Sequence, residues 1–160
     1  MKRAPDRRGL VSAPRRRLIS AAGALIAVRA FPARAETEAL PTIAELDAFL
    51  AGRTPQFGRL VLDLPRLADD GNAVPMRLIM PGPFAPGAHV TSIALFSEKN
   101  PVPKMAQFEF PVPPAKVEID SRVRLAGSQR VTAVAVLADG TVHAALADVS
   151  VTISACLDGS

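Results

Sequence analysis

The fold of this chain follows from residues 131–153, whose sequence is VTAVAVLADGTVHAALADVSVTI. Residues 131–137 are apolar except for Thr132, as expected of a strand that is buried on both faces. Asp139-Gly140 is a tight-turn signal that links this strand to a second one over residues 141–153. The second strand ends in an alternation of apolar and polar residues over 149–153, which places the apolar side chains on one face. We therefore predict a central β-hairpin whose second strand stops near Ile153.

Further strand candidates lie upstream of this hairpin and are separated by turns rich in proline and glycine. They cover residues 59–64, 73–80, 89–97, 104–110 and 116–125. A turn is expected at Asp69-Asp70-Gly71-Asn72, and prolines mark the loops that follow residues 80, 100 and 110. About seven strands at short intervals, with almost no helix, predict an all-β, immunoglobulin-like β-sandwich.

A short helix is expected before the strands, over residues 42–51. Thr42 can cap it, with Glu45 three residues further on, and Gly52 ends it. The apolar residues of this segment share one face, as in an ordinary amphipathic helix packed on a sheet; they are Ile43, Leu46, Phe49 and Leu50.

Residues 1–35 have the layout of a twin-arginine export signal. Arg15-Arg16-Arg17 precedes the short apolar run 18–28, and Ala33-Arg34-Ala35 supplies small residues for cleavage after Ala35. The apolar run is about half the roughly 20 residues that span a bilayer, so no membrane anchor is expected after cleavage. The predicted location of the mature protein is therefore the periplasm.

Removal of the signal reverses the net charge. Residues 36–160 hold 10 Lys and Arg against 14 Asp and Glu, a net charge of −4. The chain also has no Trp or Tyr for stacking on bases, so we expect no nucleic-acid partner. We expect one domain over residues 36–153, followed by an arm over residues 154–160.

The arm carries Cys156, which is the only cysteine in the sequence. A single cysteine cannot close an internal disulfide, so its thiol must be buried, paired with another molecule or kept free for chemistry. Because chain ends outside a sheet are mobile, we predict that the thiol is exposed on a flexible arm. The candidate site residues are Cys156 as the attachment point, with Ser154, Ala155, Leu157 and Asp158 around it.

The twin-arginine route exports proteins that are already folded, so its use needs a reason such as a bound cofactor or a partner subunit. His89 and His143 lie far from each other and from Cys156 in sequence, and no cysteine pair could hold zinc or an iron–sulfur cluster. We therefore predict no cofactor and no metal site. A partner subunit without its own signal explains the route better.

Several segments, in this order, resemble the SoxY family of sulfur carriers. They are Leu67–Pro75 (LADDGNAVP), Glu98–Pro103 (EKNPVP), Arg122–Leu125 with Gln129, and the hairpin strands 131–137 and 149–153. The resemblance covers nearly the whole mature chain. It implies an immunoglobulin-like fold, a heterodimer with a SoxZ-like subunit, and a cysteine arm that carries sulfur intermediates between Sox-type cytochrome and hydrolase enzymes. It also implies that the chain is itself no enzyme.

The arm departs from the Gly-Gly-Cys-Gly-Gly ending of SoxY. Ser154-Ala155-Cys156-Leu157-Asp158 is more similar to the Ala-Ala-Cys-Ile-Glu ending of the SoxY-related AACIE arm branch. Loss of the flanking glycines stiffens the arm, and Leu157 adds an apolar group that calls for a shallow apolar pocket on a partner. The carboxylate of Asp158 disfavours the thiolate form of Cys156.

Two other functions remain open from the sequence. The chain could be an exported immunoglobulin-like structural or assembly module in which Cys156 is incidental. It could also be a thiol enzyme, in which His143 or His89 would have to lie close enough to act as a base. Each histidine is expected instead on the surface or in a loop.

Overall fold

The computed structural model describes residues 39–155, which form one helix, nine strands and a short 3-10 helix, η1 (Gly71–Ala73). The helix is α1 (Ala44–Leu50), and the strands are β1 (Gln56–Phe57), β2 (Val61–Asp63), β3 (Leu67–Asp70), β4 (Val74–Met80), β5 (Val90–Ser97), β6 (Lys104–Glu109), β7 (Val117–Val123), β8 (Gln129–Leu137) and β9 (Val142–Ile153). In this part of the chain, no helix has the length and apolar character needed to cross a membrane.

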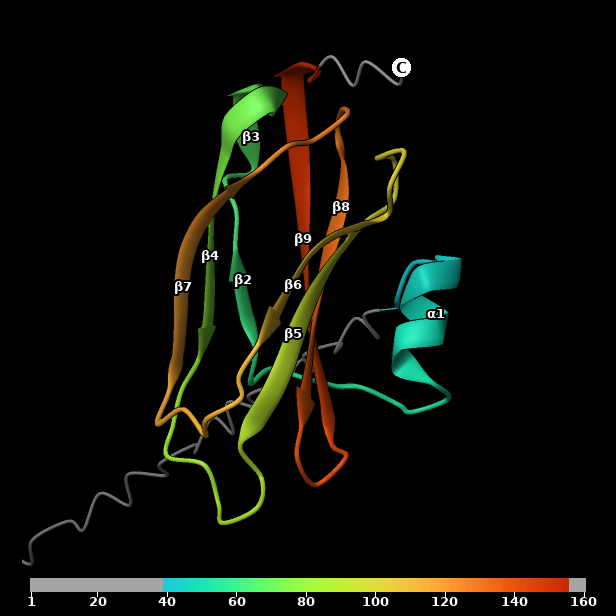
Figure 1. Cartoon of the computed structure of the whole chain (residues 1–160). Helices are drawn as coiled ribbons and strands as arrows, with labels where there is room; N and C mark the ends of the chain where they lie inside the picture. Colours follow the sequence, from blue (N-terminus) through green and yellow to red (C-terminus); the bar gives the residue numbers. More distant parts are fainter. Residues whose placement is uncertain (1–38, 156–160) are drawn as a thin grey trace, which may run out of the picture. The chain divides into compact units, whose positions relative to one another are not determined.

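The strands form two sheets (Figure 1). The larger sheet has the order β1-β9-β8-β5-β6, and β3 also pairs with β9. The smaller sheet has the order β2-β4-β7. The pairs are antiparallel except for β1 and β3, which both run parallel to β9. Because β9 is twelve residues long, β1 pairs near its start and β3 near its end.

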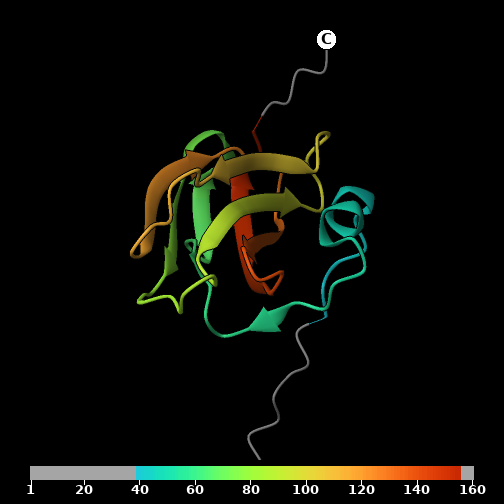
Figure 2. The same cartoon turned by 60° about the horizontal axis from the view of Figure 1, so that its bottom comes forward.

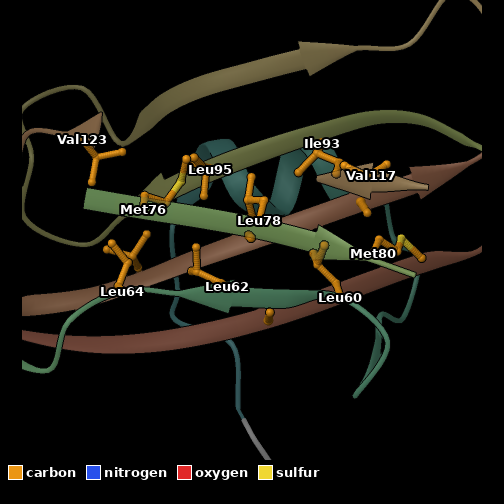
Figure 3. Close-up of a cluster of buried hydrophobic side chains, with 14 of the residues drawn as sticks. Leu60, Leu62, Leu64, Met76, Leu78, Met80, Ile93, Leu95, Val117 and Val123 are labelled. Carbon is orange, nitrogen blue, oxygen red and sulfur yellow. The ribbon is translucent and has the colours of Figure 1, made fainter. Parts of the chain in front are cut away.

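The main hydrophobic core lies between the two sheets (Figure 3). Leu78 and Met80 of β4 face Ile93 and Leu95 of β5, and all four side chains are inaccessible to solvent. Burial of such side chains away from water is the dominant favourable contribution to folding. The sandwich is therefore stabilised mainly by contacts between strands that are far apart in sequence.

A second, smaller core lies on the outer face of the large sheet, where α1 covers it (Figure 2). Leu46 and Leu50 of α1 are buried in this cluster, and the ring of Phe49 lies 5.6 Å from that of Phe96 on β5. Strand β8 contributes to both cores, with Ala133 on the sandwich side and Val134 on the helix side. This explains the apolar run over residues 133–137 of β8.

The predicted all-β, immunoglobulin-like sandwich with a short N-terminal helix is confirmed. The predicted cap was wrong: α1 begins at Ala44, its N-cap residue is Ile43, and no side chain caps it. The turn expected at residues 69–72 is shorter than predicted, because Asp69 and Asp70 belong to β3 and only the 3-10 segment 71–73 turns. The two short parallel strands, β1 and β3, were not foreseen. Segments of two and four residues are too short to show an alternation of apolar and polar side chains.

The substitution Leu78→Ala tests the main core. The side chain lies at the centre of β4 and is fully buried, so its truncation should lower the free energy of unfolding by about 3 kcal/mol. Val61→Ala on β2, which removes a side chain that is 44% exposed, should cost less than about 1 kcal/mol. Equal losses for the two variants in urea unfolding would contradict this account of the core.

Candidate functional site at the end of strand β9

The predicted site is described up to the residue that precedes its cysteine. Ser154 and Ala155 are the last described residues, whereas Cys156, Leu157 and Asp158 lie outside the described part of the chain, as does the predicted signal over residues 1–35. The structure therefore shows how the residues directly before Cys156 are held by the domain.

Strand β9 is held on both sides at its C-terminal end. It pairs with β8 on one side, and on the other β3 pairs with its last residues, with Leu67 opposite Ser150 and Asp70 opposite Ile153. The Oγ of Ser128 accepts a hydrogen bond from the backbone N–H of Val151 at 2.8 Å. The end of β9 thus has partners on each edge, so it is not a free strand.

Ala155 is anchored beyond the end of the strand. Its backbone N–H donates to the carbonyl oxygen of Leu125 at 3.2 Å, and the N–H of Leu125 donates to the carbonyl oxygen of Gly71 at 2.8 Å. The side chain of Ala155 is 5% exposed. We call these three residues, Gly71, Leu125 and Ala155, the arm root. The anchored chain therefore extends two residues past Ile153, where the sequence suggested that the domain ends and the arm begins.

Gly71 makes this close approach possible. A Cβ atom at this position would lie 2.4 Å from the carbonyl oxygen of Leu125 and 2.8 Å from the backbone nitrogen of Ala155. Both distances are too short for non-bonded atoms. The arm root therefore requires glycine at position 71 for its close packing.

A partly buried polar network fixes the loop that carries Leu125. The amide oxygen of Asn100 accepts hydrogen bonds from the N–H of Ala126 and from the side chain of Gln129, both at 3.0 Å. The amide nitrogen of Asn100 donates to the carbonyl oxygen of Arg124 at 2.9 Å. Ser97 completes the network by donating to Gln129. Because backbone and side-chain groups are paired on both sides of Leu125, its carbonyl is held in place for Ala155.

Neither histidine lies near the arm root. His143 is near the start of β9, ten positions before Ile153, which corresponds to about 33 Å along an extended strand. His89 lies in the loop before β5, where its carbonyl accepts from the N–H of Ala138 next to the β8–β9 turn. His89 is thus a loop residue as predicted, but the prediction of a surface or loop position for His143 was wrong. Its side chain is only 5% exposed, on a strand.

The surroundings of His143 favour the neutral form of its imidazole. Burial, together with the positive charge of Arg59, lowers the pKa of His143 below its ordinary value of 6.5. Its Nδ1 has no hydrogen-bond partner within the described part of the chain. We interpret His143 as a neutral core residue. Among residues 39–155, no three His, Cys, Asp or Glu side chains gather as metal ligands would.

Comparison with known families decides the relationship. A family profile described as "Sulfur oxidation protein SoxY" matches residues 46–156. The chain belongs to the SoxY family. The match includes the helix from Leu46 onward, every strand of both sheets and the arm root, and its last residue is Cys156. The predicted family is thereby confirmed, and with it a role in sulfur oxidation.

Solved structures resemble this SoxY family member in fold. A candidate superoxide reductase from Thermotoga maritima aligns with a TM-score of 0.52 and 13% identity, covering 61% of this chain and 93% of that one. A superoxide reductase (neelaredoxin) variant from Ignicoccus hospitalis gives a TM-score of 0.47 and 13% identity, covering 70% and 99%. Murine CRIg gives 0.34 and 9%, covering 61% and 100%. The search of curated proteins found no match.

Sequence reasoning did not identify Gly71 and Leu125 as part of the site. Both lie within segments that carry the resemblance to SoxY, LADDGNAVP and Arg122–Leu125. Their contributions come from backbone atoms, a carbonyl oxygen and the space left by a missing Cβ. A residue-type pattern does not reveal such contributions, although a glycine that directly follows two aspartates is a usable signal of a tight approach.

Substitution of Gly71 by alanine tests the arm root of this SoxY-family domain. The added Cβ must displace Leu125 or Ala155, so the free energy of unfolding should fall by about 1 to 3 kcal/mol, and the amide of Ala155 should exchange faster with solvent. Gly127→Ala is the matched control, because its Cβ would meet only the Oγ of Ser154, at 3.4 Å. If both variants preserve the protection of Ala155, the close approach at Gly71 is not required.

The buried His143 predicts a dependence of stability on pH. Its folded-state pKa is lower than the ordinary value of 6.5, so below pH 6.5 the unfolded chain binds more protons than the folded chain. The contribution of neutral His143 to stability is therefore complete above pH 6.5 and is lost as the pH falls below it. His143→Gln should flatten this slope in urea unfolding between about pH 5 and about pH 8. An unchanged slope in the His143 variant would refute this assignment.

Proposed function

We propose that the mature protein is a periplasmic sulfur carrier that is exported by the twin-arginine route and holds sulfur intermediates covalently on Cys156. Membership of the SoxY family supports a role in sulfur oxidation. The observation that carries the proposal is that the family match ends on Cys156, the only cysteine of the chain. The arginine pattern of residues 15–17 and the small residues at 33–35 support the export route.

The arm root supports carriage in a second way. The backbone N–H of Ala155 is hydrogen-bonded to the carbonyl oxygen of Leu125 in a folded part of the domain. The residue that follows Ala155 therefore starts from a defined position. The Cys156 sulfur then lies within about 7 Å of the Cα of Ala155 by covalent geometry alone. A carrier needs such a firm attachment for the residue that holds its thiol.

The chemistry expected at Cys156 is the making and breaking of sulfur–sulfur bonds. An oxidant such as a Sox-type cytochrome takes two electrons as the Cys156 sulfur bonds to the outer sulfur of thiosulfate, and the thiol proton passes to water. Hydrolysis by a second enzyme then breaks the bond to the sulfonate group and releases sulfate, leaving a persulfide. An oxidising enzyme then removes six electrons from the outer persulfide sulfur, which takes three oxygen atoms from water and becomes a sulfonate. Hydrolysis of the bond between this sulfonate and the Cys156 sulfur releases a second sulfate and returns the thiol.

We assign no catalysis to the chain itself. A thiol enzyme needs a base within hydrogen-bond reach of its sulfur, about 3 Å. Both histidines lie at the opposite end of β9 from the arm root. The proposed chemistry is therefore supplied by other proteins.

The expected partners follow from the same argument. A SoxZ-like subunit without its own signal would form the heterodimer and would account for export of a folded protein. The cytochrome and hydrolase that serve this arm, or divergent equivalents, must accept Leu157 and Asp158 where a SoxY arm has glycine. We expect such enzymes to offer a shallow apolar pocket instead of a narrow channel.

The intact mass of the mature protein tests the proposal. Protein purified from the periplasm of cells grown on thiosulfate should carry a sulfur adduct that a reductant removes, because thiols exchange with sulfur–sulfur bonds. Cys156→Ser should lack the adduct while folding normally. It should also abolish thiosulfate oxidation in the host. An exported structural module would instead carry no adduct, and its Cys156→Ser variant would support normal growth.

A further inference from the structure

A groove runs along the open side of the sandwich, between β6 of the large sheet and β7 of the small sheet. It has a volume of about 640 Å³. Each of these strands pairs with a single neighbour, β5 and β4 respectively, among the strands of the described chain. Their other edges face the groove with backbone groups that no strand satisfies.

The floor of the groove is apolar. Its side chains continue the main core outward, from the buried Met76, Leu95 and Val123 to the half-buried Met105 and Phe108. Figure 3 shows the three buried side chains at one end of the core. Val102, which is 70% exposed, lies at the rim. The groove thus offers apolar surface that a partner could remove from water.

The rim of the groove is basic. Lys104, Arg122 and Arg124 line it, and none of them forms an ion pair with a carboxylate of the described chain. By contrast, Arg77 forms ion pairs with Glu118 and Asp120, and Arg130 forms one with Asp148. The mature chain is acidic, so this concentration of unpaired positive charge in one place indicates an acidic ligand.

The groove ends beside the arm root. Arg124 and Asn100 line the groove, and Arg124 directly precedes Leu125, whose carbonyl anchors Ala155. Asn100 donates to the carbonyl oxygen of Arg124 and so joins the two features rigidly. A ligand in the groove would therefore lie next to Ala155, the residue that precedes Cys156.

We propose that this groove binds a partner protein through an extended segment that alternates apolar and acidic side chains. The segment would add to the free edges of β6 and β7, insert its apolar side chains over Met105 and Phe108, and place its carboxylates on Lys104, Arg122 and Arg124. Addition of a strand to an exposed sheet edge is a common mode of recognition. This inference rests on the proposed function for the identity of the partner, the SoxZ-like subunit.

The test uses the mature full-length chain and the SoxZ-like subunit of the same organism. Arg122→Glu combined with Arg124→Glu should weaken binding about tenfold or more, mainly through slower association, and added salt should reduce the difference from the unsubstituted chain. Arg66→Glu is the matched control, because Arg66 is exposed and does not line the groove. Hydrogen exchange of the complex should show new protection of amides in β6 or β7.

Three outcomes overturn the inference. They are full affinity of the Arg122 and Arg124 double variant, protection that is confined to other strands, and the absence of any complex. The carrier function is decided separately by the mass of the Cys156 adduct, which needs no purified partner. Failure of the groove proposal can therefore be distinguished from failure of the carrier proposal.

Discussion

Burial of β8 on both of its faces is the constraint on which the rest of this structure depends. One face of the strand packs into the sandwich core and the other under α1, so β8 binds three layers together. Its pairing with β9 then fixes the strand that leads to the arm. Loss of packing around β8 would also destabilise the arm root, because β9 pairs with β8 and packs into the same core.

The larger elements could be predicted from the sequence because their apolar residues either alternate with polar ones or, as in β5 and β8, form a run that is largely buried. Strands β4 to β9 appear within a few residues of their predicted limits, and the helix begins two residues later than expected. Burial of apolar side chains at every second position is a strong signal. Residues such as Gln56 and Phe57 of β1 provide no such signal, because their pairing with β9 is made by backbone atoms alone.

The site could be predicted only in part. The position of Cys156 and the end of β9 at Ile153 follow from residue types. The bond from Ala155 to Leu125 does not, because it depends on three segments that come together only in the folded chain. His143 shows the same limit, since a single polar residue in an apolar strand does not reveal which face it occupies or that it is buried.

The anchoring of Ala155 also sets how far the sulfur can travel. If the chain were free from Ile153 onward, the sulfur could reach roughly 13 Å from the Cα of Ile153, whereas with Ala155 fixed it reaches about 7 Å from the Cα of Ala155. The accessible volume scales with the cube of this reach, so anchoring reduces it to about a sixth. Under the proposed carrier function, an enzyme that loads or unloads this thiol would have to contact the end of the domain itself. The shape of that end, and not the arm alone, would then select which enzymes dock productively.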